Sequence, residues 1–304
     1  MSDRAAMSGL RSVVAPNKGK LRGVAARAVF DDIIGHTPQP KGVGFREDIV
    51  GGVPGWWCEP EGVSADRVVL HIHGGWFNWG SAEAFRNLVG HVAQSAAARA
   101  FVPNYRLAPE HPFPAAPMDV AACFDGLFER GAKAVAITGD SAGGNLALVL
   151  LAQLVAQAKA DQVVGAVVLS PVTDLAQTGE SWASRADADP FFVQDQAEEL
   201  IKAYLNGHNP TDLMASPLYG DLTGLPPVRV HVGADEVLLD DSLRYADRAA
   251  AAGVDVSVDV WEGMPHGFLG NVGDFDAAGA ALIAIGDFLK ARFAAGAPAM
   301  TSAA

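Results

Sequence analysis

The chain has 304 residues, half of them hydrophobic, which suits one large α/β domain or two small ones and provides an ample core. Its net charge of −13 argues against a nucleic-acid partner, which would require a basic surface. Two cysteines, Cys58 and Cys123, are too few for a disulfide framework and match no zinc spacing, so we expect buried free thiols. We recognise neither a signal-peptide core nor an apolar run long enough to span a bilayer, and therefore expect a cytoplasmic protein.

The first third of the chain changes from helical to strand-like patterns. Residues 1–42 show weak helical periodicity and no strand pattern, which predicts helices packed over another part of the molecule. Segments 43–50 and 53–59 flank Gly51-Gly52, and this arrangement predicts a β-hairpin. The elements expected next are a buried strand at 67–72, a helix at 81–98, a strand at 99–103, a proline-rich loop at 105–117 and a helix ending near Gly131.

The central stretch, 134–157, places a glycine-flanked serine between a strand and a helix. An apolar run at 134–138 predicts a strand buried on both faces, and a Leu- and Ala-rich helix follows the pattern Gly139-Asp140-Ser141-Ala142-Gly143. The two flanking glycines lack Cβ atoms, so strand and helix can approach closely around a strained Ser141. This geometry predicts a nucleophile beside the N–H groups of a helix N-terminus. The alternative is a glycine-rich turn whose serine only caps the helix.

The remaining half continues to alternate strands with helices. We expect strands at 163–169, 228–232 and 254–260, and helices at about 240–252 and 274–293. Such alternation predicts a mostly parallel sheet covered on both faces. Segment 174–227 is too long for a simple crossover and carries its own helix at 194–205, so we expect it to form a lid above the strand ends.

Chemically useful residues also follow other strands of the predicted sheet. His73-Gly74-Gly75 follows the strand at 67–72, and adjacent glycines can direct backbone N–H groups at a developing oxyanion. A glycine turn beside a core histidine is the alternative, and we interpret His71, inside the strand, as structural.

A carboxylate and a histidine complete the pattern. Asp235 is the first acidic residue past the strand at 228–232, where a carboxylate can orient an imidazole. Glu236, Asp240 and Asp241 compete for this role, although the last two are typical of residues that cap the following helix. His266 lies on the loop before the final helix, within reach of Ser141 as a general base. The order Ser, Asp, His, each after its own strand, is the α/β-hydrolase arrangement.

Over roughly residues 43–293, the chain resembles the hormone-sensitive-lipase-like esterases (bacterial family IV) of the α/β-hydrolase superfamily. The matching motifs are His73-Gly74-Gly75, Tyr105-Arg106-Leu107-Ala108-Pro109-Glu110, Gly139-Asp140-Ser141-Ala142-Gly143-Gly144, Gly233-Ala234-Asp235-Glu236 and His266-Gly267-Phe268. The resemblance implies the α/β-hydrolase fold, with about eight strands in a mostly parallel sheet flanked by helices. It also implies a helical cap, built from about 1–42 and about 174–227, within one domain of residues 1–304.

The resemblance also implies roles for individual residues. Ser141 would be the nucleophile, His266 the base and Asp235 the partner of His266. The oxyanion donors would be the backbone N–H groups of Gly74, Gly75 and Ala142. Relatives act mostly on short-chain acyl esters, use neither cofactor nor metal, and often form homodimers.

One departure from the family pattern concerns the third glycine after the histidine, which is Trp76 in this chain. The indole, with Phe77 and Trp79 close by, suggests a narrow aromatic wall in which Trp76 and Phe77 contact the substrate. The alternative is that these aromatic residues pack beneath the cap.

These observations favour a serine carboxylesterase that acts through an acyl-enzyme. An amide, formamide or lactone hydrolase with the same triad is the first alternative, because this machinery serves any activated acyl group. A ligand-binding protein on a hydrolase scaffold, like the plant gibberellin receptors, is the second. Retention of Ser141, Asp235 and His266 argues against that second alternative.

Overall fold

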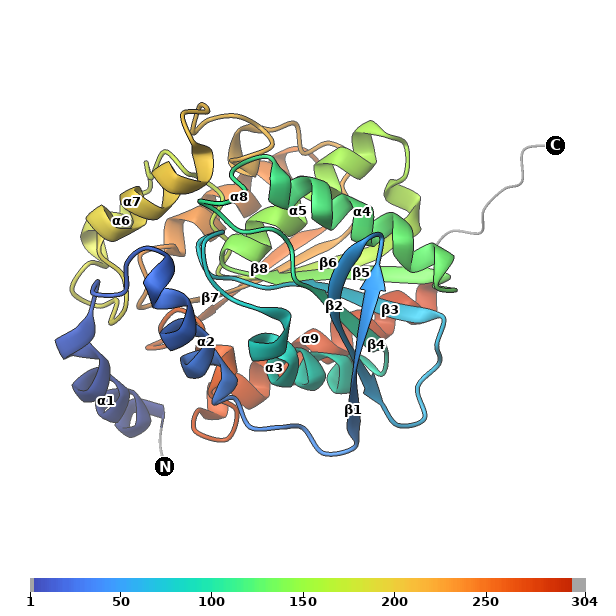
Figure 1. Ribbon diagram of the computed structural model, residues 1–304, viewed down its shortest axis with the longest axis horizontal. Helices are drawn as coiled ribbons and strands as arrows, with labels where there is room; N and C mark the ends of the chain where they lie inside the picture. Colours follow the sequence, from blue (N-terminus) through green and yellow to red (C-terminus); the bar gives the residue numbers. More distant parts are fainter. Residues whose placement is uncertain (1–2, 297–304) are drawn as a thin grey trace.

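The computed structural model describes residues 3–296, and a single twisted sheet runs through their centre (Figure 1). Its eight strands are β1 (Val43–Val50), β2 (Val53–Pro60), β3 (Arg67–Ile72), β4 (Arg99–Pro103), β5 (Ala134–Asp140), β6 (Val163–Leu169), β7 (Val228–Gly233) and β8 (Val256–Trp261). They are ordered β1-β2-β4-β3-β5-β6-β7-β8. The β1–β2 and β2–β4 pairs are antiparallel and all the other pairs are parallel, which confirms the predicted mostly parallel sheet.

Helices cover both faces of this sheet, and α3 and α9 lie on the face opposite to α4, α5 and α8 (Figure 1). The helices of four or more residues are α1 (Asp3–Val14), α2 (Arg27–Gly35), α3 (Ala82–Ala96), α4 (Ala115–Glu129), α5 (Ala142–Ala156), α6 (Ser181–Ser184), α7 (Gln194–Leu205), α8 (Leu239–Ala251) and α9 (Asp276–Ala295). Alternate strand residues serve the two faces, because side chains in a strand point to opposite sides. Leu70 packs with α5 and Val69 with α3 and α9, and both are fully buried.

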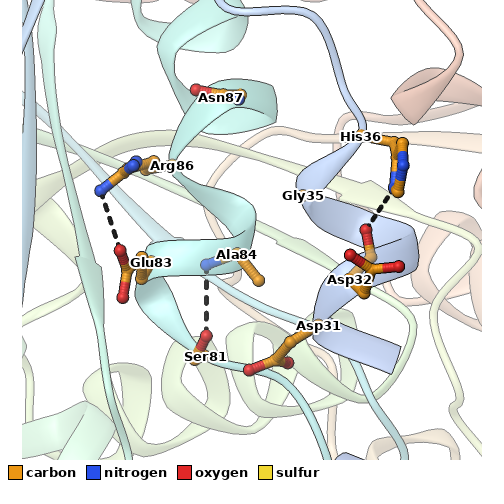
Figure 2. A pocket seen from close by; sticks show the side chains of 9 residues that line it. All are labelled: Asp31, Asp32, Gly35, His36, Ser81, Glu83, Ala84, Arg86 and Asn87. Atoms are coloured by element: carbon orange, nitrogen blue, oxygen red, sulfur yellow. Dashed lines mark hydrogen bonds and ion pairs between the residues drawn. The ribbon is translucent and has the colours of Figure 1, made fainter. Parts of the chain in front are cut away.

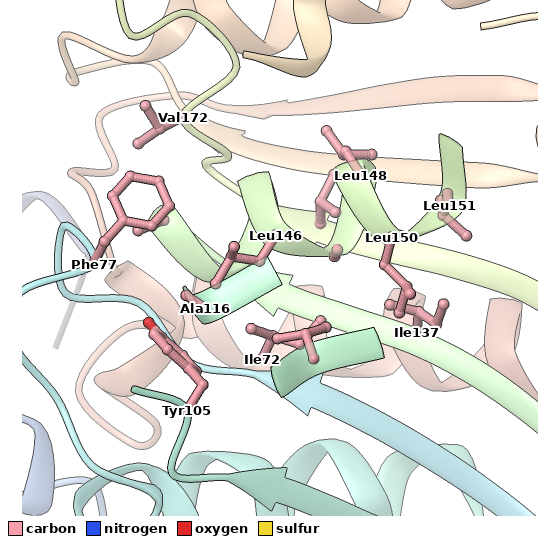
Figure 3. Close-up of a cluster of buried hydrophobic side chains, with 14 of the residues drawn as sticks. Ile72, Phe77, Tyr105, Ala116, Ile137, Leu146, Leu148, Leu150, Leu151 and Val172 are labelled. Atoms are coloured by element: carbon pink, nitrogen blue, oxygen red, sulfur yellow. The ribbon is translucent and has the colours of Figure 1, made fainter. Parts of the chain in front are cut away.

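The α5 side of the sheet holds the core below the serine turn. Figure 3 shows Leu146 and Leu150 of α5 beside Ile72 of β3 and Ile137 of β5. All four side chains are 2% exposed or less, so the helix that follows Ser141 is anchored along its whole inner face. The cysteines Cys58 and Cys123 are buried free thiols, as expected.

Several predicted boundaries differ from the structure by one or two residues, and two of the differences have a clear physical reason. Strand β8 begins at Val256 and not at Val254, because the Val254 N–H still bonds to Ala249 O at the end of α8. Helix α4 begins at Ala115, inside the expected loop, and includes Pro117 in its first turn. A proline is tolerated there because the first N–H groups of a helix have no partner within the helix.

The N-terminal segment (residues 3–42) lies against the insertion (residues 174–227) at one end of the molecule, where α1 and α2 approach α6 and α7 (Figure 1). Arg22 forms ion pairs of 2.9 Å with Asp195 and 2.8 Å with Glu199, and both partners belong to α7. These contacts join two parts of the chain that are distant in sequence. Within residues 3–296, no helix is long and apolar enough to cross a membrane.

Candidate active site

Ser141 occupies the sharp turn between β5 and α5 that the glycine pattern predicts. Its φ of 54° and ψ of −120° lie outside the regions that ordinary residues favour. A Cβ atom on Gly139 would collide with the carbonyl of Gly143, and one on Gly143 would collide with the carbonyl of Ile72. The close approach of strand and helix therefore requires both glycines. The Ser141 side chain makes no capping hydrogen bond, so the alternative of a simple helix cap is wrong.

His266 pairs with a carboxylate that belongs to Glu236. Its Nδ1–H donates to Glu236 Oε2 over 2.6 Å, and the Glu236 side chain has no exposed surface. The other oxygen, Oε1, accepts hydrogen bonds from Ser170 Oγ at 2.6 Å and from the Gly233 N–H at 2.7 Å. This carboxylate is therefore held from three sides, by the loop after β6, the end of β7 and the histidine.

The prediction that Asp235 orients His266 is wrong. Asp235 Oδ2 accepts a hydrogen bond from Arg11 over 2.8 Å, and its side chain is 30% exposed. The backbone gives the reason, because the Asp235 N–H bonds to Met264 O at 3.1 Å as β7 turns towards the loop of His266. The Asp235 side chain then faces the N-terminal segment, and the longer Glu236 side chain reaches the imidazole.

The other two acidic candidates, Asp240 and Asp241, do not cap the helix that follows. Asp240 accepts the N–H of Ser181, and Asp241 accepts those of Thr173 and Asp174.

The charges around His266 favour its protonated form. Burial lowers the pKa of the imidazole, but the surrounding carboxylates, with Glu236 the foremost, together raise the pKa above its usual value. Asp189 and Asp140 act in the same direction. Ser141 follows β5 and His266 lies on the loop after β8, so both leave the carboxyl ends of parallel strands, where this type of sheet gathers its functional groups.

The glycines after β3 border the serine, but Gly74 is not free to donate. A Cβ atom on Gly74 would lie 3.1 Å from Ser141 Cβ. The Gly74 N–H already donates to Asp140 Oδ1 at 3.0 Å, which contradicts its predicted role as an oxyanion donor. In the described part of the chain, the N–H groups of Gly75 and Trp76 have no acceptor, and the Ala142 N–H is the first of α5.

His73 is a structural residue in this arrangement. Its ring stacks on Tyr105 with centroids 4.3 Å apart, and its Nδ1–H donates to Gly74 O at 2.8 Å. Complete burial lowers the pKa of the imidazole to about 4, so it is neutral at physiological pH. The neutral ring fixes the start of the glycine turn and carries no proton for catalysis. His71 is also structural, with its ring nitrogens on Thr138 and Asp140.

Comparison with known proteins agrees with this geometry. Residues 69–270 match a family model described as the alpha/beta hydrolase fold. An esterase from Acinetobacter venetianus is 36% identical over 256 residues, which cover 83% of this chain and 84% of that protein. An acetyl-hydrolase from Streptomyces hygroscopicus is 36% identical over 219 residues, or 71% of this chain and 73% of that protein. A crystal structure described as an esterase from the bacterial hormone-sensitive lipase family superposes with a TM-score of 0.90 and 34% identity, covering 96% of this chain and 99% of the other.

The chain belongs to the hormone-sensitive-lipase-like esterases. Its fold is the α/β-hydrolase fold, as the sequence motifs imply, and the protein is a carboxylic ester hydrolase. The loops described above lie where this fold places its chemistry, at the carboxyl ends of neighbouring parallel strands.

The aromatic residues of this esterase divide between packing and the neighbourhood of His266. Phe77 stacks on Tyr204 with centroids 3.9 Å apart, and Trp79 donates its indole N–H to Gly23 O of the N-terminal segment at 2.8 Å. Trp76 packs edge-to-face on Phe192, whose ring lies 4.9 Å from that of His266. For Phe77 and Trp79 the structure thus favours packing, while Trp76 belongs to an aromatic group beside the candidate base.

The backbone conformation at Trp76 explains why the family pattern has glycine at this position. Its φ of 53° lies in the left-handed region, and Phe77 follows with a φ of 61°. Glycine adopts such angles without cost, whereas a tryptophan there is strained. Trp76 therefore has a backbone conformation that suits the glycine of the family pattern.

A surface groove lies elsewhere on the esterase, between α2 and the start of α3 (Figure 2). It measures about 430 Å³ and is lined by Asp31, Asp32, Gly35, His36, Ser81, Glu83, Ala84, Arg86 and Asn87. None of these residues belongs to the loops that hold Ser141, Glu236 and His266. Several pair locally, including Glu83 with Arg86 at 3.3 Å. We assign no chemistry to this groove.

Proposed function

We propose that this esterase hydrolyses short-chain acyl esters with Ser141 as nucleophile, His266 as general base and Glu236 as the acid of the triad. The observation that carries the proposal is the buried 2.6 Å contact of Glu236 with His266, on the loops that follow β7 and β8. Together with the strained serine turn after β5, it supplies each group that acyl transfer needs.

In the proposed reaction, His266 takes the Ser141 hydroxyl proton as Oγ attacks the ester carbonyl carbon. The oxyanion that forms accepts hydrogen bonds from the N–H groups of Gly75, Trp76 and Ala142. His266 then gives its proton to the alcohol oxygen, the alcohol leaves, and an acyl-Ser141 ester remains. A water molecule, deprotonated by His266, cleaves that ester and returns the enzyme to its starting state.

Glu236 makes the imidazole a better base in two ways. Its hydrogen bond from Nδ1–H fixes the tautomer that leaves Nε2 free to accept a proton, and its charge stabilises the imidazolium ion. Because Ser170 and Gly233 occupy its second oxygen, the carboxylate cannot rotate away from His266. The proposal thus assigns to Glu236 the role that the sequence pattern suggested for Asp235.

Aromatic side chains near His266 support a preference for small acyl groups. Trp76 is 1% exposed and packs between Trp182 and Phe192 of the insertion, with ring centroids at 6.3 Å and 5.4 Å. We propose that the N-terminal segment and the insertion together form the cap, within a single domain that includes the core. The relative from Streptomyces hygroscopicus is named an acetyl-hydrolase, which agrees with a small acyl group. We retain Trp76, which packs on Phe192 beside His266, as the residue that contacts substrate, and not Phe77, which stacks on Tyr204.

We also propose that β8 pairs with β8 of a second copy to form a homodimer. This strand is at the edge of the sheet, and Val260 is 41% exposed on it. An uncovered edge strand is a template for pairing. Sedimentation of the protein should show a dimer that Val260→Lys weakens, and a monomer at all concentrations would contradict this proposal.

Turnover and covalent labelling test the proposed chemistry. We expect p-nitrophenyl acetate and butyrate to be cleaved faster than long-chain esters or a matched anilide, and a fluorophosphonate to label Ser141. Ser141→Ala should abolish the labelling and lower the activity about 10⁴-fold. Ser184→Ala, at an exposed serine, is the control and should keep both. Labelling of another residue, or Ser141→Ala activity within tenfold of wild type, would refute the assignment.

A further inference from the structure

Asp189, on the loop between α6 and α7, joins the insertion to the loop that carries Glu236. Its side chain is buried, with a residue exposure of 1%. Oδ1 accepts the N–H groups of Phe191 at 2.8 Å and Phe192 at 3.0 Å. Oδ2 accepts the N–H of Val237, the residue after Glu236, at 3.0 Å. One carboxylate therefore fixes backbone from two regions that meet above the sheet.

Each of the two regions also contacts His266: one through Glu236, the residue before Val237, and the other through Phe192 itself. Glu236 accepts the Nδ1–H bond at 2.6 Å, and the edge of the Phe192 ring packs against the imidazole at 4.9 Å. We propose that Asp189 is a positioning residue of the esterase. It holds the Glu236 loop and Phe192 in the positions from which they contact the catalytic histidine. The inference rests on the proposed roles of Ser141, Glu236 and His266.

A structural turn alone would not require a carboxylate here. The two N–H groups of Phe191 and Phe192 share one oxygen, which an asparagine amide would also supply. Only a carboxylate offers a second acceptor to Val237 and adds a negative charge. Burial raises the pKa of the Asp189 carboxyl, while its three N–H donors act in the opposite direction. Since a proton would displace one of these donors, we infer that the carboxyl is ionised.

The N-terminal segment holds this loop from the outer side. Lys18 Nζ donates to Asp189 O at 2.6 Å, the Gly19 N–H donates to Phe191 O at 3.2 Å, and Arg11 Nη1 donates to Ala188 O. The loop is therefore clamped between the N-terminal segment and the core. Such a clamp limits how far the loop can relax to compensate for a change at Asp189.

The charge of Asp189 also favours the protonated form of His266. The acidic groups around the imidazole are Glu236 after β7, Asp189 on the insertion and Asp140 at the end of β5, and each raises its pKa. They stabilise the imidazolium ion that forms when His266 takes the Ser141 proton. Asp189 acts on the reaction through the histidine and touches neither substrate nor nucleophile in this account.

Asp189→Asn tests the inference, because it keeps the size of the side chain and removes the charge and the second acceptor. We expect kcat/KM at the alkaline plateau to fall about tenfold or more, since small displacements of catalytic groups are costly. The acid limb of the kcat/KM profile should also move to lower pH, because a negative charge that raises the pKa of His266 has been lost. Asp187→Asn, which neutralises an exposed carboxylate on the same loop, should leave both quantities unchanged.

Asp189→Glu separates charge from position and decides the question if Asp189→Asn fails to fold. It should keep the acid limb of wild type and still lower kcat/KM, because the longer side chain shifts the loop. A rate equal to wild type in either variant, or a slow Asp189→Asn enzyme whose acid limb has not moved, would overturn the inference. His266→Ala measured in parallel identifies the other failure: if it stays active, the proposed triad is wrong, whereas an inactive His266→Ala leaves the test to Asp189 alone.

Discussion

The serine turn after β5 and the acid loop after β7 lie on the same edge of the sheet but are determined by different physics. The serine turn depends on backbone collisions within a few residues, because Gly139 and Gly143 leave no room for a Cβ atom. In the acid loop either of two adjacent carboxylates, Asp235 or Glu236, could contact His266, and contacts with residues distant in sequence decide which one does. Ser170 holds Glu236 inward, and Arg11 holds Asp235 outward.

This difference shows which motifs carry their own geometry. A turn defined by missing side chains has one solution, so the pattern alone predicts it. A loop with two carboxylates has two solutions, which differ by tertiary contacts that no local spacing records.

The largest effect should separate the two carboxylates. Glu236→Gln should lower kcat/KM by about 10³–10⁴-fold, in line with loss of the orienting carboxylate in a serine hydrolase triad. Asp235→Asn should stay within about tenfold of wild type, because its side chain contacts Arg11 and not His266. Steady-state kinetics on p-nitrophenyl acetate measure both variants. The reverse ranking would show that the acid loop adopts the other solution during catalysis.

At the serine turn, the expected effect is on stability. Gly143→Ala places a Cβ atom against the carbonyls of Ile72 and His73, and should destabilise the protein by about 1–3 kcal/mol or more. Gly279→Ala in α9, where a Cβ atom meets open space, should instead stabilise it by about 0.5–1 kcal/mol. Thermal unfolding of the two variants measures the difference. An equal Tm for both would mean that the turn tolerates a side chain.

The pH dependence of wild type should reflect the charges of the acid loop. Since Glu236 raises the pKa of His266 and the neutral imidazole is the active base, kcat/KM should rise with pH and reach half of its plateau above pH 6.5. In Glu236→Gln the remaining activity should titrate at lower pH, because the carboxylate charge has gone. A midpoint well below pH 6 in wild type would contradict the contact between these residues.

The smallest effect concerns Trp76, beside the serine turn. Trp76→Gly removes an indole that packs on Phe192 and places glycine at a φ of 53°, where it is unstrained. The ratio of kcat/KM for tert-butyl acetate to that for ethyl acetate should rise severalfold. Trp79→Phe, which alters packing beneath the N-terminal segment, should leave the ratio unchanged. If Trp76→Gly also leaves it unchanged, the indole is a packing residue.

The fold and two of the three proposed triad positions could be predicted from the sequence for physical reasons. Buried parallel strands produce apolar runs, and β3, β4 and β6 begin and end where those runs do. Ser141 follows β5 directly, and His266 lies on the short loop after β8. Glu236 could not be preferred to Asp235, because the choice depends on Ser170, a polar residue at the end of a buried strand whose partner is 66 residues away.

Two further residues could not be interpreted from the sequence around them. Asp189 lies in a loop without periodicity, and its role emerges only where the insertion meets Val237. The prediction for Gly74 as an oxyanion donor is wrong for a related reason. Its N–H donates to Asp140, at the end of the neighbouring strand β5. Hydrogen bonds between distant segments decide these cases, and sequence spacing does not encode them.

The central claim is that His266 donates its Nδ1–H to Glu236, and the proton NMR signal of that hydrogen tests it most directly. A short bond to a carboxylate moves such a proton far downfield of other amide and ring protons. We predict this signal in wild type and in Asp235→Asn, and its loss or large upfield shift in Glu236→Gln. A signal that persists in Glu236→Gln and disappears in Asp235→Asn would contradict the account.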